Sequence, residues 1–196
     1  MKRHLEAGDV AELVSIKSVK DQIPLFVGNG YLIREVAQLS DAPMHFYLFG
    51  GMGLALGVAI GYMRATETPR ALILEGDGNF YMGLTGALLC SEAKLAVVHV
   101  VCANGVYEST GGQALPCRPQ NVRLLAEALG YTAFFTASDR QSLQECLERA
   151  TGLEGPSLIW GTAARRSLAA PARPQTDARS IAARFRRWSL ERGPGA

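Results

Sequence analysis

Glycine-rich turns directly follow short apolar segments of this chain at four places. They are Gly28-Asn29-Gly30, Gly50-Gly51-Met52-Gly53, Gly76-Asp77-Gly78 and Asn104-Gly105. The apolar segments alternate with amphipathic segments of helical length, a pattern typical of a parallel sheet with helices on both faces. Ligands of such a sheet bind beyond the carboxyl ends of its strands. The four turns therefore predict one binding crevice at that edge.

The predicted fold class is α/β, with a doubly wound, mostly parallel six-stranded sheet covered by helices on both faces. The expected strands are residues 24–27, 45–48, 71–74, 95–102, 132–135 and 157–160, and the expected helices are residues 8–20, 31–39, 52–64, 80–92, 121–129, 139–151 and 177–190. We expect one domain over residues 1–162 and, over residues 163–196, a basic arm with an amphipathic helix. Ile181, Phe185 and Trp188 recur at helical spacing, so this helix is expected to pack on the domain or on a partner.

Positive charge is concentrated in the last part of the chain. The whole chain has a net charge of +2, but residues 161–196 hold eight arginines against Asp177 and Glu191. A basic tail can bind nucleic acid or an acidic partner. No aromatic-rich or RNA-recognition motif accompanies it, so we do not expect nucleic-acid binding.

No membrane segment or secretory signal is expected. The longest apolar stretch, residues 49–63, contains five glycines and is shorter than the roughly 20 residues that a membrane-spanning helix needs. The N-terminus lacks the apolar core of a secretory signal. We therefore expect a cytoplasmic protein that binds no membrane.

Asp77 and Asn104 follow two strands whose ends we expect at one sheet edge. Magnesium prefers about six oxygen ligands, and protein sites usually supply one or two carboxylates while phosphate and water supply the rest. Asp77, the Asn104 side-chain oxygen and the Val106 carbonyl would provide three of them. Taken alone, the Gly-Asp-Gly motif also fits an ordinary turn with Asp77 capping a helix. Neither a P-loop nor the GxGxxG spacing of a dinucleotide site occurs in the chain.

Together, these motifs resemble those of thiamine-diphosphate enzymes. Gly76-Asp77-Gly78, the 25 residues that follow (79 to 103) and the closing Asn104 are similar to the signature of the domain that binds the cofactor's diphosphate through a divalent metal. Residues 49–53 and 104–113 resemble phosphonopyruvate decarboxylase and the beta subunit of sulfopyruvate decarboxylase. The resemblance covers roughly residues 8 to 162. It implies the thiamine-diphosphate-binding fold.

The resemblance also implies a set of metal and diphosphate ligands. Asp77, Asn104 and the Val106 carbonyl would bind Mg²⁺. Gly78 and Asn79 would contact the diphosphate of thiamine diphosphate, and Asn29 lies where the family has a small polar loop that touches phosphate.

Other residues would hold the rings of the cofactor. The resemblance implies that the Gly50 carbonyl accepts a hydrogen bond from the aminopyrimidine and that Met52 wedges between the two rings. A plain core methionine remains the alternative for Met52. The remaining members of the implied cofactor-binding set are Gly51, Gly76 and Tyr107. Ala103 stands where the family usually has Asn or Asp, which could lower affinity for the cofactor.

The family needs a glutamate from a separate pyrimidine-binding domain to activate the cofactor. Met1 stands just ahead of the first expected helix, so we expect this chain to be one subunit of a two-component enzyme. Its partner would be a pyrimidine-binding alpha subunit in a hetero-oligomer such as α2β2. The catalytic residues within this chain stay unassigned, and the chain alone is expected to be inactive.

The implied reaction is decarboxylation of a small 2-oxo acid to an aldehyde and CO2, with phosphonopyruvate or sulfopyruvate as the favoured substrate. Ser109, Thr110 and Gln113 could bind the additional anionic group or could simply organise their loop. A carboligase subunit like that of acetolactate synthase and a non-catalytic cofactor-binding or regulatory module remain open alternatives. The sequence does not decide between the substrates, and it leaves the role of the arginine-rich arm open.

Overall fold

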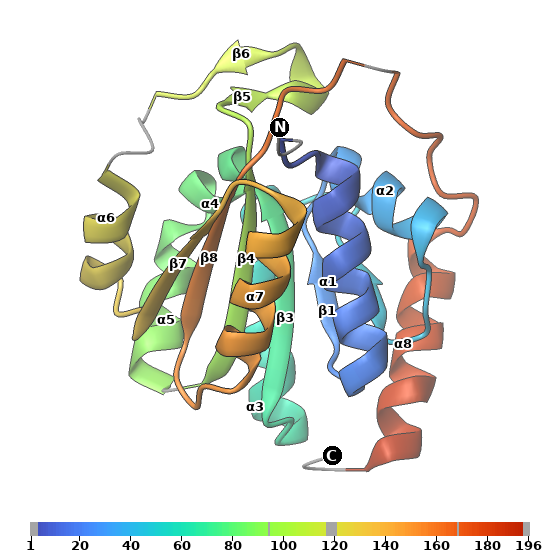
Figure 1. Cartoon of the computed structure of the whole chain (residues 1–196). Coiled ribbons are helices and arrows are strands. Elements are labelled where there is room, and N and C mark those ends of the chain that lie inside the picture. Colours follow the sequence, from blue (N-terminus) through green and yellow to red (C-terminus); the bar gives the residue numbers. More distant parts are fainter. Residues whose placement is uncertain (1–3, 94, 117–120, 168, 194–196) are drawn as a thin grey trace.

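A six-stranded parallel sheet forms the centre of the computed structural model, which describes residues 4–93, 95–116, 121–167 and 169–193 (Figure 1). The strands are β1 (Leu25–Val27), β2 (His45–Tyr47), β3 (Arg70–Gly76), β4 (Ala96–Ala103), β7 (Ala133–Ala137) and β8 (Ser157–Thr162). They lie in the order β2-β1-β3-β4-β8-β7, and neighbouring strands of this sheet are parallel throughout. The predicted fold class and the six predicted strands are confirmed.

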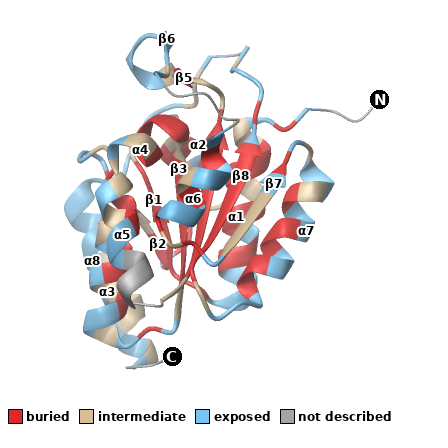
Figure 2. Cartoon of the chain, turned by 90° about the vertical axis from the view of Figure 1, so that its left-hand side faces the viewer, coloured by how far each residue is buried: buried red, intermediate tan, exposed pale blue. Residues whose placement is uncertain are grey.

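Helices cover both faces of the sheet. One face packs against α1 (Ala7–Asp21), α2 (Tyr31–Leu39) and α7 (Arg140–Thr151), and the other packs against α3 (Ala55–Thr66), α4 (Asp77–Met82), α5 (Leu84–Ala93) and α6 (Val122–Ala128). Along β3, Leu72 and Leu74 face the first group, while Ala71 and Ile73 face the second. Figure 2 shows the central strands buried and the outer helix faces exposed. Burial on both faces explains why this strand is apolar at successive positions.

A crevice forms where the chain changes direction across the sheet. β1 lies between β2 and β3, and the helices that follow β1 and β3, α2 and α4, pack on opposite faces. The loops at the carboxyl ends of these two strands therefore separate, which leaves room for a ligand between them.

The helix expected over residues 80–92 is wrong in its extent. Helix α4 begins at Asp77, and α5 begins only at Leu84. Between them, the backbone of Gly83 lies directly against the backbone of Gly53, so a Cβ atom on Gly83 would overlap the carbonyl oxygen of Gly53. This close backbone contact between segments remote in sequence accounts for the break.

A small hairpin after β4 was not predicted. It consists of the antiparallel strands β5 (Val106–Tyr107) and β6 (Gln113–Ala114), joined by the 3₁₀ turn η1 (Glu108–Thr110). Gly111 and Gly112 follow the turn with φ angles of 134° and 75°, which glycine adopts at little cost. The hairpin stands above the carboxyl ends of the strands (Figure 1).

Helix α8 (Ala178–Arg192) packs at the β2 edge of the sheet. Its Phe185 ring lies 5.4 Å from the ring of Phe26 and 5.3 Å from that of Phe46. Arg184 donates two hydrogen bonds, of 2.6 and 2.8 Å, to the carboxylate of Asp41. Of the two alternatives left open by the sequence, the helix packs on this domain.

The opposite edge of the sheet, β7, carries two aromatic side chains covered by arginines. The guanidinium carbon of Arg123 lies 4.8 Å from the ring centre of Phe134, and that of Arg149 lies 5.0 Å from that of Phe135. These are cation–π distances.

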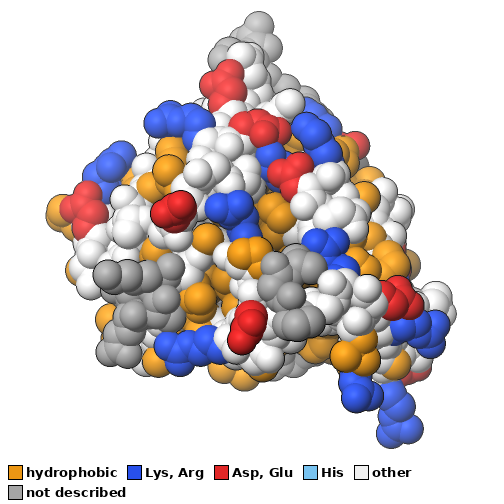
Figure 3. Space-filling model, turned by 90° about the horizontal axis from the view of Figure 1, so that it is seen from below, with side chains coloured by type: hydrophobic (Ala, Val, Ile, Leu, Met, Phe, Trp, Pro, Cys, Tyr) orange, Lys and Arg blue, Asp and Glu red, His pale blue; other side chains and the backbone are white. Residues whose placement is uncertain are grey.

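The basic arm connects β8 to α8 by passing above the carboxyl ends of the strands (Figure 1). On the opposite side of the molecule, seen in Figure 3, lysine and arginine side chains are interspersed with acidic and apolar ones. None of the helices in the described ranges has the length and apolar character needed to span a bilayer.

Replacing Gly83 with alanine tests the backbone contact between Gly53 and Gly83. We expect Gly83→Ala to lower the free energy of unfolding by about 2 kcal/mol, because the new methyl group must displace backbone atoms. Gly61→Ala is the matched control, since a Cβ on this exposed helical glycine meets nothing within 4 Å. It should raise stability by up to about 1 kcal/mol. Urea denaturation measures the free energy of unfolding of both variants. Equal stability of the two would contradict the close backbone contact between Gly53 and Gly83.

Candidate functional site

A cavity of about 60 Å³ lies at the carboxyl ends of β1, β3 and β4. Its walls come from the turn after β1, the segment before α3, the start of α4 and the chain between β4 and η1. Of the residues singled out in the sequence as candidate ligands, those that line it are Asn29, Met52, Gly76, Asp77, Gly78, Asn79, Asn104, Val106, Tyr107 and Ser109. Gly50 and Gly51 lie outside it.

Asp77 is the buried acidic group of this cavity. It opens α4 directly after β3, and only 2% of its surface is exposed. Its carboxylate accepts hydrogen bonds from the backbone N–H of Gly105 at 2.7 Å and of Gly78 at 2.9 Å. The ends of β3 and β4 are thereby joined.

The electrostatic environment of Asp77 favours a bound cation. Burial raises the pKa of its carboxyl above the ordinary value, and the hydrogen bonds from Gly105 and Gly78 only partly oppose this. Within the described part of the chain, no basic side chain lies within ion-pair distance of Asp77. A cation in the cavity would stabilise the charged carboxylate.

Asn104 places a second oxygen at the cavity. It follows β4, and its side-chain oxygen accepts a hydrogen bond from the Val106 N–H at 3.1 Å. Carboxylate, amide and carbonyl oxygens suit a hard cation such as Mg²⁺. Among the described residues, no group of three or more His, Cys, Asp or Glu is placed to hold a metal ion. The donor set therefore fits magnesium completed by phosphate and water better than zinc.

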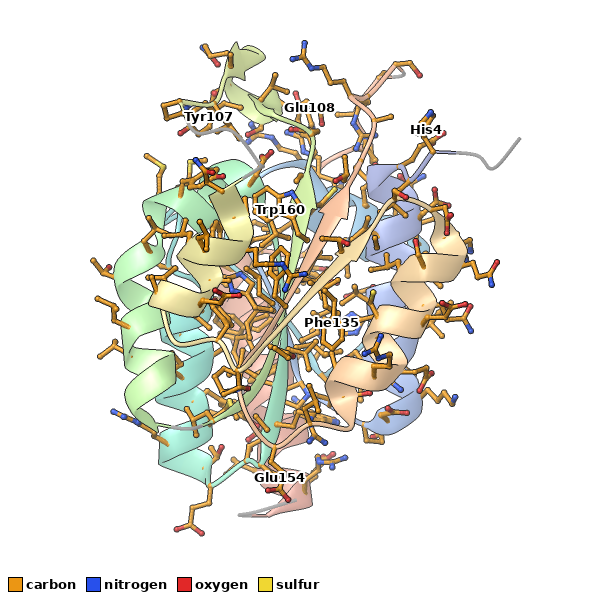
Figure 4. The ribbon with its side chains drawn as sticks, turned by 60° about the vertical axis from the view of Figure 1, so that its left-hand side comes forward. His4, Tyr107, Glu108, Phe135, Glu154 and Trp160 are labelled. Atoms are coloured by element: carbon orange, nitrogen blue, oxygen red, sulfur yellow. The ribbon has the colours of Figure 1, made fainter. Side chains whose placement is uncertain are left out.

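Gly78 has no room for a side chain. A Cβ atom there would lie 2.6 Å from two ring carbons of Tyr107 and 3.1 Å from the Cε of Met52. Tyr107 and Met52 thus pack over the start of α4 and form one wall of the cavity. In Figure 4, Tyr107 and Glu108 lie above the carboxyl ends of the strands.

Asn79 connects two of the glycine-rich turns. Its side-chain oxygen accepts a hydrogen bond from the Gly53 N–H at 3.0 Å, and its side-chain nitrogen donates to the Asn29 carbonyl at 3.1 Å. The side chain therefore holds the loops after β1 and β2 against α4. The side-chain oxygen of Asn29 is buried and has no hydrogen-bond partner among the described residues, so a donor in the cavity would satisfy it.

Three charged residues next to the cavity were not among the predicted site residues. Arg166, from the basic arm, lines the cavity together with Glu108. Its backbone N–H donates to Glu108 at 2.8 Å, and its guanidinium lies 2.5 Å from a carboxylate oxygen of Glu35. The only signal in the sequence was the excess of arginine in the tail, which does not say which arginine reaches the site.

Comparison with known proteins places residues 28–160 within the sequence model described as "Thiamine pyrophosphate enzyme, C-terminal TPP binding domain". The chain is 35% identical over 170 residues to a phosphonopyruvate decarboxylase of Streptomyces hygroscopicus, covering 86% of this chain and 42% of that protein. It is 29% identical over 128 residues to the sulfopyruvate decarboxylase subunit beta of Methanothermobacter thermautotrophicus, covering 65% and 66% respectively. The chain thus spans about two fifths of the curated phosphonopyruvate decarboxylases that it matches.

The fold is also shared with solved structures. A thiamine diphosphate-dependent 4-hydroxybenzoylformate decarboxylase from Rhodococcus jostii superimposes with a TM-score of 0.72 at 19% identity, over 86% of this chain and 34% of that one. At this identity the match supports the fold alone.

The structural role of Asn79 can be measured without any ligand. Asn79→Asp keeps an acceptor for the Gly53 N–H but removes the donor to Asn29 and sets a carboxylate against its carbonyl. We expect a loss of about 2 kcal/mol in the free energy of unfolding, as for an unsatisfied buried polar group. Asn121→Asp, at an exposed position, is the control. If both variants unfold at the same denaturant concentration as the original chain, Asn79 does not hold the loops.

Proposed function

Because this chain belongs to the family of thiamine pyrophosphate enzymes, with their C-terminal TPP binding domain, we propose that it binds thiamine diphosphate through Mg²⁺. We further propose that it is the diphosphate-binding subunit of a 2-oxo acid decarboxylase. The favoured substrates are phosphonopyruvate and sulfopyruvate, and the products are an aldehyde and CO2. The names of the relatives support this choice.

The observation that carries the proposal is the meeting of Asp77, Asn104 and Val106 at one cavity. In the proposed complex, the oxygens of these residues hold the magnesium ion, and the ion holds the diphosphate. Gly78 lies beside them, and we propose that its backbone at the start of α4 contacts the diphosphate. The raised pKa of Asp77 supports the proposal because a divalent cation would offset the cost of burying the charged carboxylate.

When bound, thiamine diphosphate supplies the electron sink for loss of CO2 from a 2-oxo acid. The chain itself positions the cofactor. We propose that Met52 supports its bent shape from the wall that it forms with Tyr107. Gly50 and Gly51 lie on the exposed loop outside the cavity, and we propose that they contact the aminopyrimidine, which is the part farthest from the diphosphate.

We also propose a partner that carries the pyrimidine-binding domain and the activating glutamate. Two relatives of comparable size are named sulfopyruvate decarboxylase subunit beta, which supports a two-component enzyme such as α2β2. The adjacent helices α3 and α5 expose apolar side chains, among them Val58, Leu88 and Leu89. Such side chains on neighbouring helices suit a surface that a partner covers.

Asp77→Asn tests cofactor binding in the chain itself. Thiamine diphosphate is titrated with and without Mg²⁺, and binding is followed by calorimetry. We expect magnesium-dependent affinity to fall at least about 100-fold, since loss of even an outer-sphere partner costs 10–100-fold. Glu154→Gln, an equivalent acid-to-amide change on an exposed residue at the opposite end of the sheet (Figure 4), should leave it unchanged. Equal magnesium-dependent binding of thiamine diphosphate by the two variants would contradict the proposed metal site.

The same variants are then assayed with the pyrimidine-binding partner. Formation of equal amounts of aldehyde and CO2 from phosphonopyruvate or sulfopyruvate by the original chain, and loss of this reaction in Asp77→Asn, would support the decarboxylase. A hydroxyketone product would instead identify a carboligase. Cofactor binding without consumption of any 2-oxo acid would identify a non-catalytic module.

A further inference from the structure

A second, larger cavity lies beside the first. It encloses about 670 Å³, within the range of small-molecule sites. Asn29, Gly30 and Ser109 line both cavities. The remaining walls come from α2, from Phe49, from Thr110 and from residues 173–178 at the end of the basic arm and the start of α8. A ligand here would therefore lie next to the proposed cofactor site.

Two arginines line this second cavity, Arg34 from α2 and Arg173 from the arm. Neither has an ion-pair partner among the residues that the structure describes. Asp177 is the acidic residue of the lining, but its carboxylate is engaged at the start of α8, where it accepts hydrogen bonds of 2.9 Å from the Ser180 N–H and hydroxyl. The lining therefore has an excess of positive charge.

Arg166 differs from these two arginines because its charge is compensated. Its guanidinium lies 2.5 Å from Glu35 and 3.6 Å from Glu108. This pairing anchors the arm near the cofactor cavity and leaves Arg34 and Arg173 as the cations available to a ligand.

The arm also fixes the position of Arg34. One guanidinium nitrogen donates to the Pro171 carbonyl at 3.2 Å, and the guanidinium carbon lies 4.8 Å from the centre of the Tyr31 ring. Stacking on one face and a single hydrogen bond leave other N–H groups free to donate. A planar guanidinium held in this way is suited to bind a tetrahedral oxyanion through two hydrogen bonds.

We propose that Arg34 and Arg173 bind the phosphonate or sulfonate group of the substrate in this second cavity. The inference rests on the proposed function, since it names the part of the chain that selects substrates with an additional anionic group. Ser109, on the wall shared by the two cavities, is placed to add a donor. Gln113 does not line the cavity; Thr110 does, but its hydroxyl donates to the Gln113 side chain at 3.1 Å. These two residues organise the loop.

Phosphonoacetate tests the site without any reaction, because it carries a phosphonate but no 2-oxo group. Calorimetry on the whole chain should show affinity reduced about tenfold or more in Arg34→Gln and in Arg173→Gln, as expected for a lost charge-assisted hydrogen bond. Arg34→Lys keeps the charge but loses the planar pair of donors, so its affinity should fall between those of Arg34→Gln and the original chain. Arg187→Gln, an exposed arginine of α8 that lines neither cavity, should bind as the original chain does.

Magnesium-dependent binding of thiamine diphosphate is measured in the same variants, and it should change less than about twofold. Equal weakening of cofactor and phosphonoacetate binding would assign the arginines to the cofactor's phosphates and overturn the inference. Unchanged phosphonoacetate affinity in both glutamine variants, or none in the original chain, would overturn it too. Arg173 is exposed, so Arg173→Gln remains informative if Arg34→Gln fails to fold.

With the partner present, kcat/KM for phosphonopyruvate should fall about 10–100-fold in the glutamine variants, while kcat/KM for pyruvate should not. A parallel loss for both substrates would contradict a role in selecting the anionic group. Failure of the proposed function would appear differently, as absence of magnesium-dependent cofactor binding in the original chain.

Discussion

The buried carboxylate of Asp77 is the group around which this end of the molecule is arranged. It joins the ends of β3 and β4 through the N–H groups of Gly78 and Gly105, yet it lacks a basic side chain nearby within the described residues. The folded chain therefore carries an electrostatic cost that a cation would relieve. Asn79 holds the adjoining turns in place by hydrogen bonds within the chain, so part of the cavity wall is fixed by the protein's own contacts.

The fold was largely predictable from the sequence because its strands are short apolar runs that end in glycine-rich turns. Strands buried on both faces need apolar residues at successive positions, and this requirement is visible locally. The break at Gly83 was not predictable, because it depends on a backbone contact with Gly53 that arises only in the folded chain. The hairpin after β4 was also missed, since its strands span two residues each and carry no periodic pattern.

The candidate site was likewise predictable only in part from the sequence. Asp77, Asn104 and their neighbours stand at strand ends, and a parallel sheet brings such ends together by its topology. Arg34, Arg166 and Arg173 could not be assigned, because the path of the arm over α2 decides which arginines reach the cavities. Asn79 shows a second limit. The resemblance implied a diphosphate contact for Asn79, which stays a prediction, but it did not reveal the hydrogen bonds that Asn79 makes to the two neighbouring turns.

The two edges of the sheet bear on how the chain behaves before it meets a partner. An uncovered edge strand can recruit a strand from another molecule and start aggregation. Helix α8 packs at the β2 edge, and at β7 the rings of Phe134 and Phe135 each lie beneath a guanidinium. Helix α8 thereby disfavours addition of a strand at the β2 edge, while the two arginines place positive charge beside β7, which opposes pairing with the same edge of another copy.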